Sequence, residues 1–220
     1  MERPFDIQIE KLKTKLIKMC SLVDEQVEFA IKALETEDSD LASFVVERDA
    51  KVDKYDVKIE KICQRLFALN QPVAMDLRLI MSALKINANL ERVGDLAVSI
   101  ARNVIDIGNK PEFHSTLHFT AISQVTRDMI KKAIDSFINN DSELAKTVLN
   151  DEGRLDSMVD EDTAALVEIM KASPDNVSPG LYYFDIFQSL ERLGDHATNI
   201  SEEVYFIVKA QLIKHHQLED

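Results

Sequence analysis

Two stretches of the chain repeat the same carboxylates at the same spacing, one hundred residues apart. Leu90-Glu-Arg-Val-Gly-Asp95 returns as Leu190-Glu-Arg-Leu-Gly-Asp195. In each copy a Glu and an Asp stand four positions apart, which stacks both carboxylates on one face of an α-helix. Two negative charges at this spacing repel each other by roughly a few tenths of a kcal/mol. The repeat indicates a duplicated structural unit, and it raises the question of which cation neutralises each pair.

Each repeated motif has a second acidic pair at a matching position in the preceding helical segment. An antiparallel hairpin around Pro72 would bring Asp53 and Glu91 to the same height, since each lies 19 residues from the turn. The second half has the same symmetry about the bond between Ser173 and Pro174. Each arm advances about 1.5 Å per residue and adjacent axes lie about 8–10 Å apart, so four carboxylates can converge in each half. The second pairs are Asp49 with Asp53 and Glu152 with Asp156.

The residue types of these clusters favour a metal centre. Carboxylate oxygens are ligands of hard cations such as Mg²⁺, Ca²⁺ and Mn²⁺, and iron and zinc also accept them. The alternative is a solvated acidic face in which Arg92 and Arg192 neutralise the acids. On a helical wheel Glu91 and Asp95 lie nearly opposite the apolar stripe, so we expect the centres on the surface. The eight predicted ligands are Asp49, Asp53, Glu91, Asp95, Glu152, Asp156, Glu191 and Asp195.

Long apolar stripes at spacings of three and four residues, interrupted by few breakers, predict an all-α fold of six helices. We expect a cap at Ser39 or Asp40 for the second helix, Pro72 in the first turn of the third, and a stop at Gly108. Short turns join antiparallel neighbours, which predicts two tandem antiparallel three-helix bundles related by internal duplication, at 1–110 and 111–220. The expected helices span about 5–34, 40–68, 72–107, 115–139, 142–171 and 179–214.

The composition argues against several classes of function. The 220 residues are 45% hydrophobic and carry a net charge of −13, which disfavours binding of nucleic acid or an anionic lipid surface by general attraction. No apolar run approaches the roughly 20 residues of a membrane span, and the N-terminus lacks a signal-peptide core, so we expect a cytoplasmic protein. Cys20 and Cys63 lie on apolar stripes, and we expect buried free thiols rather than a disulfide.

The sequence offers few candidates for catalysis. It contains no glycine-rich phosphate loop, because Gly94 and Gly194 lie singly within helices, where they favour close approach of a neighbouring helix or a ligand. No arrangement of serines and histidines recommends a nucleophile and base. The Glu-x-x-His motif of di-iron bundles does not occur, since none of the five histidines follows a Glu by three residues. We therefore expect no enzyme, with a helical-bundle carboxylate-bridged metalloenzyme as the alternative.

The segments around the repeat resemble a known family. Gln71-Pro-Val-Ala-Met-Asp-Leu-Arg78, which precedes the first motif, and His196-Ala-Thr-Asn-Ile200, which follows the second, are similar to the PhoU family of phosphate-transport regulators. The resemblance covers essentially the whole chain. Residues 178–185 depart from it, because they do not reproduce the Gln-Pro…Asp-Leu-Arg element of the first half. The two halves can therefore differ in their partner contacts.

This resemblance implies a site and a role. It implies multinuclear iron or zinc clusters, held on the surface of both bundles by the eight carboxylates named above. It also implies a cytoplasmic homodimer that acts with the phosphate ABC transporter and a membrane sensor histidine kinase. Such a protein represses the phosphate-starvation response and limits phosphate uptake. Because the positive charge of a metal cluster attracts anions, the phosphate ion is one candidate ligand.

Overall fold

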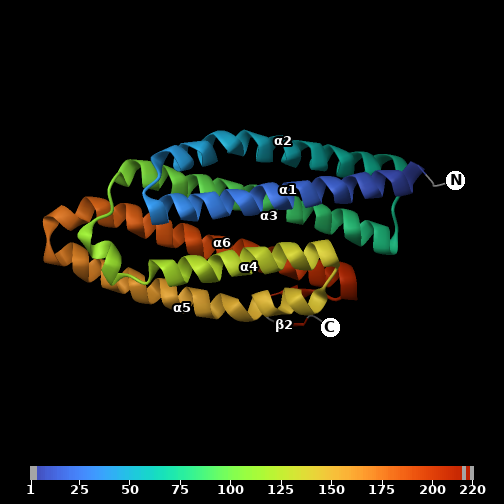
Figure 1. Cartoon of the computed structure of the whole chain (residues 1–220). Helices are drawn as coiled ribbons and strands as arrows, with labels where there is room; N and C mark the ends of the chain where they lie inside the picture. The colour runs from blue at the N-terminus through green and yellow to red at the C-terminus, as the bar shows by residue number, and fades with distance from the viewer. Residues whose placement is uncertain (1–3, 215–216, 219–220) are drawn as a thin grey trace.

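The computed structural model describes residues 4–214 and 217–218, and over these residues the chain is almost entirely helical. Its long helices run lengthwise through an elongated molecule (Figure 1). Short 3₁₀ turns, η1 (Glu112–Thr116) and η2 (Pro174–Asn176), precede two of these helices. The helices are α1 (Pro4–Thr36), α2 (Ser39–Asn70), α3 (Ala74–Ile107), α4 (Phe119–Asn139), α5 (Ser142–Ala172) and α6 (Val177–Lys209).

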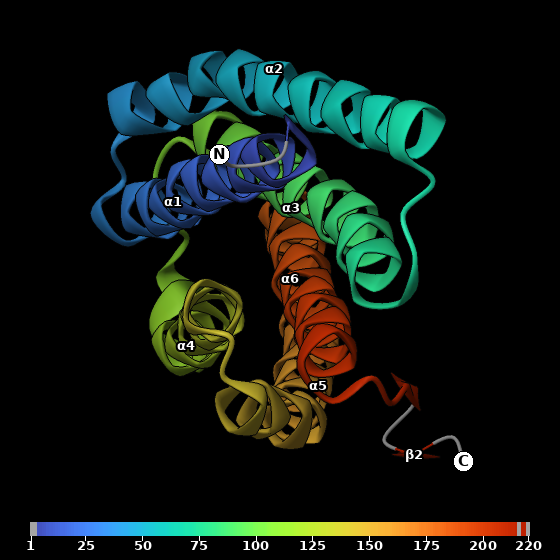
Figure 2. The ribbon, with the colours of Figure 1, turned by 90° about the vertical axis from the view of Figure 1, so that its right-hand side faces the viewer.

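The helices form two three-helix bundles that pack against each other. α1, α2 and α3 contact one another, as do α4, α5 and α6. The bundles meet mainly through α3 and α6, which lie side by side in the middle of Figure 2, and α1 also contacts α4. One main apolar core continues through both bundles. The predicted all-α fold of two bundles is confirmed.

The sequence of α3 shows how this packing arises. Leu90, Val93, Ala97 and Ile100 are completely buried and recur every three or four residues, so they form one apolar stripe along the helix. This stripe faces the helices packed around α3 and contributes to the common core. Each fully buried Leu, Val or Ile side chain contributes about 1.5–3 kcal/mol through removal of apolar surface from water.

The helices α3 and α6 are antiparallel, and the repeated motifs meet at the same level. Nδ1 of His196 on α6 lies 2.8 Å from the amide oxygen Oδ1 of Asn89 on α3, which accepts a hydrogen bond from the imidazole. Ser82 lies seven residues before Asn89 on α3, and Glu203 lies seven residues after His196 on α6. The Ser82 hydroxyl donates to the Glu203 carboxylate at 2.7 Å. Lys85 adds an ion pair to the same carboxylate at 2.7 Å. The contact register therefore centres on the two copies of the repeat.

The last helix is shorter than predicted. We expected it to reach Lys214, but α6 ends at Lys209, and Ala210 adopts a left-handed conformation with φ 58°. Beyond it Ile213 is buried in a small cluster with Leu149 and Tyr205. Burial of Ile213 redirects the chain away from the helix axis, and two short strands, β1 (Ile213–Lys214) and β2 (Gln217–Leu218), pair antiparallel.

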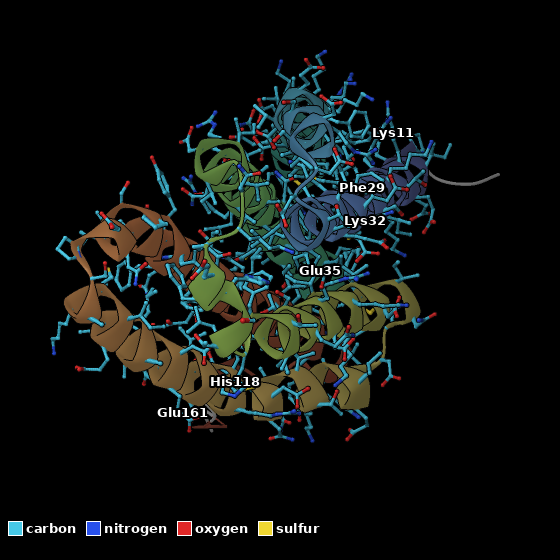
Figure 3. The ribbon with its side chains drawn as sticks, turned by 60° about the vertical axis from the view of Figure 1, so that its left-hand side comes forward. Lys11, Phe29, Lys32, Glu35, His118 and Glu161 are labelled. Carbon is cyan, nitrogen blue, oxygen red and sulfur yellow. The ribbon has the colours of Figure 1, made fainter. Side chains whose placement is uncertain are left out.

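The fourth helix begins later than the predicted residue 115. It starts at Phe119, because Asp162 of α5 holds the preceding residue in place. One Asp162 oxygen accepts from the His118 backbone N–H at 2.6 Å, and the other lies 2.8 Å from its Nδ1. Asp162 is itself buried. Figure 3 shows His118 near α5, at the point where the connection between the bundles enters α4.

The starts of α2 and α3 also differ by one or two residues from the prediction. The cap of α2 is Asp38, rather than Ser39 or Asp40, because its carboxylate accepts from the Leu41 N–H at 2.8 Å. Pro72 lies just before α3, which begins at Ala74, instead of in its first turn. The predicted stop at Gly108 is confirmed, with φ 69° at that residue.

Cys20 and Cys63 are buried free thiols, as predicted. Burial raises the pKa of both to about 12, so they remain protonated and inert at neutral pH. No helix in the described part of the chain combines the length and apolarity needed to cross a bilayer.

Candidate metal centres

The first cluster consists of Asp49 and Asp53 on α2 with Glu91 and Asp95 on α3. Asp53 is exposed and the other three are half-buried, so the cluster lies at the surface, as the helical wheel indicated. Burial raises the pKa of Asp49, and repulsion from Asp53 and from Asp95 across the helix pair raises it further. The carboxylates of the two helices are therefore close enough to repel one another.

Glu91 has the same electrostatic environment. Its pKa is raised by burial, then by Asp95 on its own helix, and also by Asp56 and Asp53 on α2. Asp56 is held by Asn87 of α3, whose amide donates to its carboxylate at 2.5 Å. The first cluster therefore has a fifth carboxylate beside it, one turn further along α2.

A buried glutamine on α1 forms hydrogen bonds with the two helices that carry the first cluster. Gln26 of α1 is completely buried, and its Nε2 donates to Asp49 Oδ1 at 2.9 Å and to the Gly94 carbonyl at 3.3 Å. The Gln26 hydrogen bond opposes the rise in the pKa of Asp49. The side chain thus ties α1 to both helices that carry the cluster and fixes one of its carboxylates.

Arg92 supplies a cation to the first cluster. Its Nη1 lies 3.0 Å from Asp95 Oδ2, and its Nε lies 3.5 Å from Glu91 Oε2. The guanidinium is mostly exposed, so solvent screens these ion pairs and each contributes about 1 kcal/mol or less. The alternative of an acidic face neutralised by arginine is therefore partly realised in the first half. A multivalent cation would compete with Arg92 for the same oxygens.

The second cluster consists of Glu152 and Asp156 on α5 with Glu191 and Asp195 on α6. Asp195 is exposed and the others are half-buried. Burial raises the pKa of Glu191, followed by repulsion from Asp156 and Asp195. Burial likewise raises the pKa of Asp195, followed by Glu152 and Asp156. The duplicated arrangement predicted from equal residue counts is thus present across both helix pairs.

The glycine within each motif allows a neighbouring helix to approach closely. A Cβ at Gly94 would lie 3.2 Å from Asp49 Oδ1 and 3.3 Å from Val52 Cγ1. A Cβ at Gly194 would lie 2.4 Å from Leu155 Cδ2. In the first half the missing side chain therefore leaves room for one of the cluster carboxylates, and in the second half it leaves room for a core leucine.

The donor set of each cluster fits a hard multivalent cation, because it is composed of carboxylates whose mutual repulsion such a cation would relieve. Among the described residues, no three His, Cys, Asp or Glu side chains converge closely enough to hold a metal ion in their present rotamers. The helices therefore bring the carboxylates to one level, and metal binding would require side-chain rotation. The assignment of the eight carboxylates as ligands stays a prediction.

Three residues near the clusters were not anticipated from sequence. Gln26 could have been found as the polar residue within the apolar stripe of α1, between Val23 and Val27. Asp160 also raises the pKa of Glu191, and no regular spacing pointed to it. His196 is half-buried at the contact of α3 with α6, where burial and then Arg92 and Arg192 lower its pKa.

Comparison with known proteins identifies the family. The model of the PhoU domain matches twice, at residues 16–104 and 119–204. The chain belongs to the PhoU family. It is 35% identical over 218 residues to the phosphate-specific transport system accessory protein PhoU homolog of Pseudomonas putida. This match covers 98% of this chain and 84% of that protein. It is 30% identical to the phosphate-specific transport system accessory protein PhoU of Escherichia coli K12, over 96% of this chain and 88% of the relative.

Solved structures of PhoU proteins show the same fold. The crystal structure of PhoU from Pseudomonas aeruginosa superposes with a TM-score of 0.89 at 34% identity, over 94% of this chain and 99% of the other. The phosphate transport system regulatory protein PhoU from Streptococcus pneumoniae superposes with a TM-score of 0.86 at 24% identity, over 96% and 99% of the two chains. At 24% identity this second likeness concerns the fold alone.

Proposed function

We propose that the protein is a metal-binding regulator of phosphate homeostasis, without catalytic activity of its own. The observation that carries this proposal is the duplicated four-carboxylate cluster, at one level of two helix pairs, in a chain of the PhoU family. The relatives named above are accessory proteins of the phosphate-specific transport system. The general part of the proposal is a role in regulating phosphate transport. Its more specific part is that the clusters bind metal.

In this more specific part of the proposal, each cluster holds a multinuclear iron or zinc centre. Other divalent cations compete for the same carboxylate oxygens. The bound cations would supply positive charge that attracts an anion such as phosphate or an acidic side chain of a partner. The chain itself contributes the carboxylates, the Gln26 contact that orients Asp49, and the exposure that leaves the centre open to a partner.

The proposed partners are the phosphate ABC transporter and a sensor histidine kinase, contacted by a cytoplasmic homodimer. Through them the protein represses the phosphate-starvation response and limits phosphate uptake. Deletion should derepress a reporter of that response in phosphate-rich medium, and the wild-type chain should restore repression. An unchanged reporter, in a host with intact transporter and kinase, contradicts the proposed role.

The metal assignment is tested by elemental analysis of protein purified without an affinity tag. Glu91→Gln with Asp95→Asn should abolish metal in the first cluster and leave the second loaded. Glu161→Gln with Glu168→Gln is the matched control, because these exposed acids of α5 lie outside both clusters. Full metal content in the first variant contradicts the assignment.

The enzyme alternative is tested with the same protein. Iron- or zinc-loaded chain is assayed with a phosphomonoester, with ATP, and with oxygen plus a reductant. We expect no turnover. Turnover that disappears in the Glu91/Asp95 and Glu191/Asp195 variants would replace the regulator by a carboxylate-bridged metalloenzyme.

A further inference from the structure

The first bundle has a cationic surface hollow, open to solvent, that lies apart from the carboxylate clusters. It has a volume of about 520 Å³ and lies between α1 and α2. In a chain of net charge −13, its lining is unusual, with five cationic side chains against one carboxylate. They are Lys18, Arg48, Lys51, Lys54 and Lys58, with Glu25 as the acid.

Arg48 forms a fixed end of this hollow. Its guanidinium lies 5.5 Å from the ring centroid of Phe29 and 5.8 Å from that of Phe44, and it forms an ion pair with Glu25. The Arg48 side chain is only 12% exposed, and its Nε is buried without a hydrogen-bond partner in the described structure. Figure 3 shows Phe29 on α1. Two aromatic rings and an acid thus hold one cation in place before any ligand binds.

The lysines of α2 form a row along the hollow. Lys51, Lys54 and Lys58 follow at spacings of three and four residues, so they share one helix face over about 10 Å. Lys51 and Lys54 are exposed and form no ion pair with the described residues, and Lys58 Nζ lies 5.6 Å from the Tyr55 ring centroid. Ammonium groups arranged in a row match successive phosphoryl groups of a single ligand.

Apart from Ser21, the remaining lining is apolar or aromatic. Ile17 and Leu22 of α1 and the Tyr55 ring of α2 contribute hydrophobic surface beside the lysine row. A ligand that fits both parts carries several phosphates and also a flat or apolar body. The volume lies within the range of about 300–1,000 Å³ that small-molecule sites occupy. A long polyanion is disfavoured, since the chain as a whole is strongly acidic.

We propose that this hollow binds a nucleoside polyphosphate. The phosphate chain contacts Lys51, Lys54 and Lys58, and the nucleoside packs on the surface of Ile17, Leu22 and Tyr55. We expect binding without hydrolysis, because Glu25 is the one carboxylate among the lining residues and it is paired with Arg48. The proposal goes beyond the metal centres and does not depend on them.

Isothermal titration calorimetry of the full chain with ATP tests the proposal, in a buffer with EDTA so that bound metal contributes nothing. Adenosine, inorganic tripolyphosphate and phosphatidylglycerol vesicles are titrated separately. We expect ATP to bind more tightly than tripolyphosphate, no measurable binding of adenosine or vesicles, and weaker ATP binding at higher salt. Lys51→Ala with Lys54→Ala should weaken ATP binding at least about tenfold, since charge-assisted hydrogen bonds are lost.

The matched control is Lys32→Ala with Lys61→Ala, which removes two exposed lysines from the same helices outside the hollow (Lys32 is labelled in Figure 3). It should leave ATP affinity within about twofold. Absence of ATP binding at millimolar concentration, equal weakening by the control pair, or binding of vesicles but not ATP overturns the proposal. Equal affinity for tripolyphosphate and ATP overturns the assignment of a nucleoside. Circular dichroism verifies that each variant is folded.

Discussion

Gln26 and Asp49 are joined by a hydrogen bond of 2.9 Å between the Gln26 amide nitrogen and the Asp49 carboxylate. The two residues belong to different helices, and the same amide also donates to the Gly94 carbonyl. The other amide atom, Oε1, is buried without a partner in the described structure. A glutamine in an apolar stripe is costly, and here its position is explained by the carboxylate that it orients.

Gln26→Leu should therefore lower the free energy of unfolding by about 1–3 kcal/mol, because the half-buried Asp49 loses its donor. Urea denaturation measures the change. Gln64→Leu is the control, since Gln64 is exposed and its amide donates to Glu60 on its own helix. It should change stability by no more than about 0.5 kcal/mol. Equal effects of the two substitutions would mean that the Gln26 contact has no structural role.

Gly194→Ala and Gly153→Ala should change stability differently, although both add the same methyl to a helix. At Gly194 the new Cβ would meet Leu155 Cδ2 at 2.4 Å, whereas nothing lies within 4 Å of a Cβ at Gly153. Gly153→Ala should stabilise the protein by about 1 kcal/mol through helix propensity. Gly194→Ala should be about 1–3 kcal/mol less stable than Gly153→Ala, because the buried leucine must move. Thermal unfolding of both variants checks this difference.

His114 should make stability depend on pH. Its Nδ1 lies 2.7 Å from the Tyr183 hydroxyl, and its pKa is lowered, first by burial and then by Lys110. As pH falls below the ordinary value of about 6.5, the unfolded chain takes up a proton that the folded chain resists, so this contribution to stability decreases.

In His114→Gln that loss should disappear. The difference in unfolding free energy between wild type and variant should therefore become smaller as pH falls from 7 to about 5. Chemical denaturation at several pH values measures it. A difference that stays constant over this range would show that His114 does not titrate differently in the two states.

Neutralising the second cluster should have opposite effects with and without metal. Without metal, Glu191→Gln with Asp195→Asn should leave the free energy of unfolding unchanged or raise it by about 0.2–0.5 kcal/mol, because the repulsion between the two carboxylates is removed. With iron or zinc, the wild type should gain stability by binding and the variant should gain less. Thermal melts with and without EDTA compare the two proteins. Equal stabilisation by metal would exclude these carboxylates as ligands.

Much of the fold follows from the spacing of apolar residues, because helices of this length have long stripes that identify their buried face. The equal heights of Asp53 with Glu91 also follow from counting, since an antiparallel hairpin of regular helices preserves residue distance from the turn. The repulsion between Asp49 and Asp95 across α2 and α3 agrees with that count.

Spacing does not determine where a helix ends or how a side chain is rotated. α6 ends early because Ile213 is buried elsewhere, which depends on Leu149 of a distant helix. The pairing of Arg92 with Asp95, and the failure of three carboxylates to converge, depend on rotamers. Gln26 was overlooked because a single polar residue hardly weakens an apolar stripe.

The antiparallel contact of α3 with α6 has an evolutionary consequence. In each facing pair, Asn89 with His196 and Ser82 with Glu203, the two residues lie equally far from the centres of their own copies of the repeat and on opposite sides of them. One copy therefore presents to the other the surface that the other presents to it. Such a mutual contact is the geometry of a twofold-symmetric dimer. A single-copy ancestor of half this length would have covered that apolar face by self-association, and fusion of two genes would then have converted the dimer into one chain. Once fused, the two copies became free to diverge. One half could then acquire the Gln26 contact and the cationic hollow, while the other half has a methionine, Met129, at the position equivalent to Gln26.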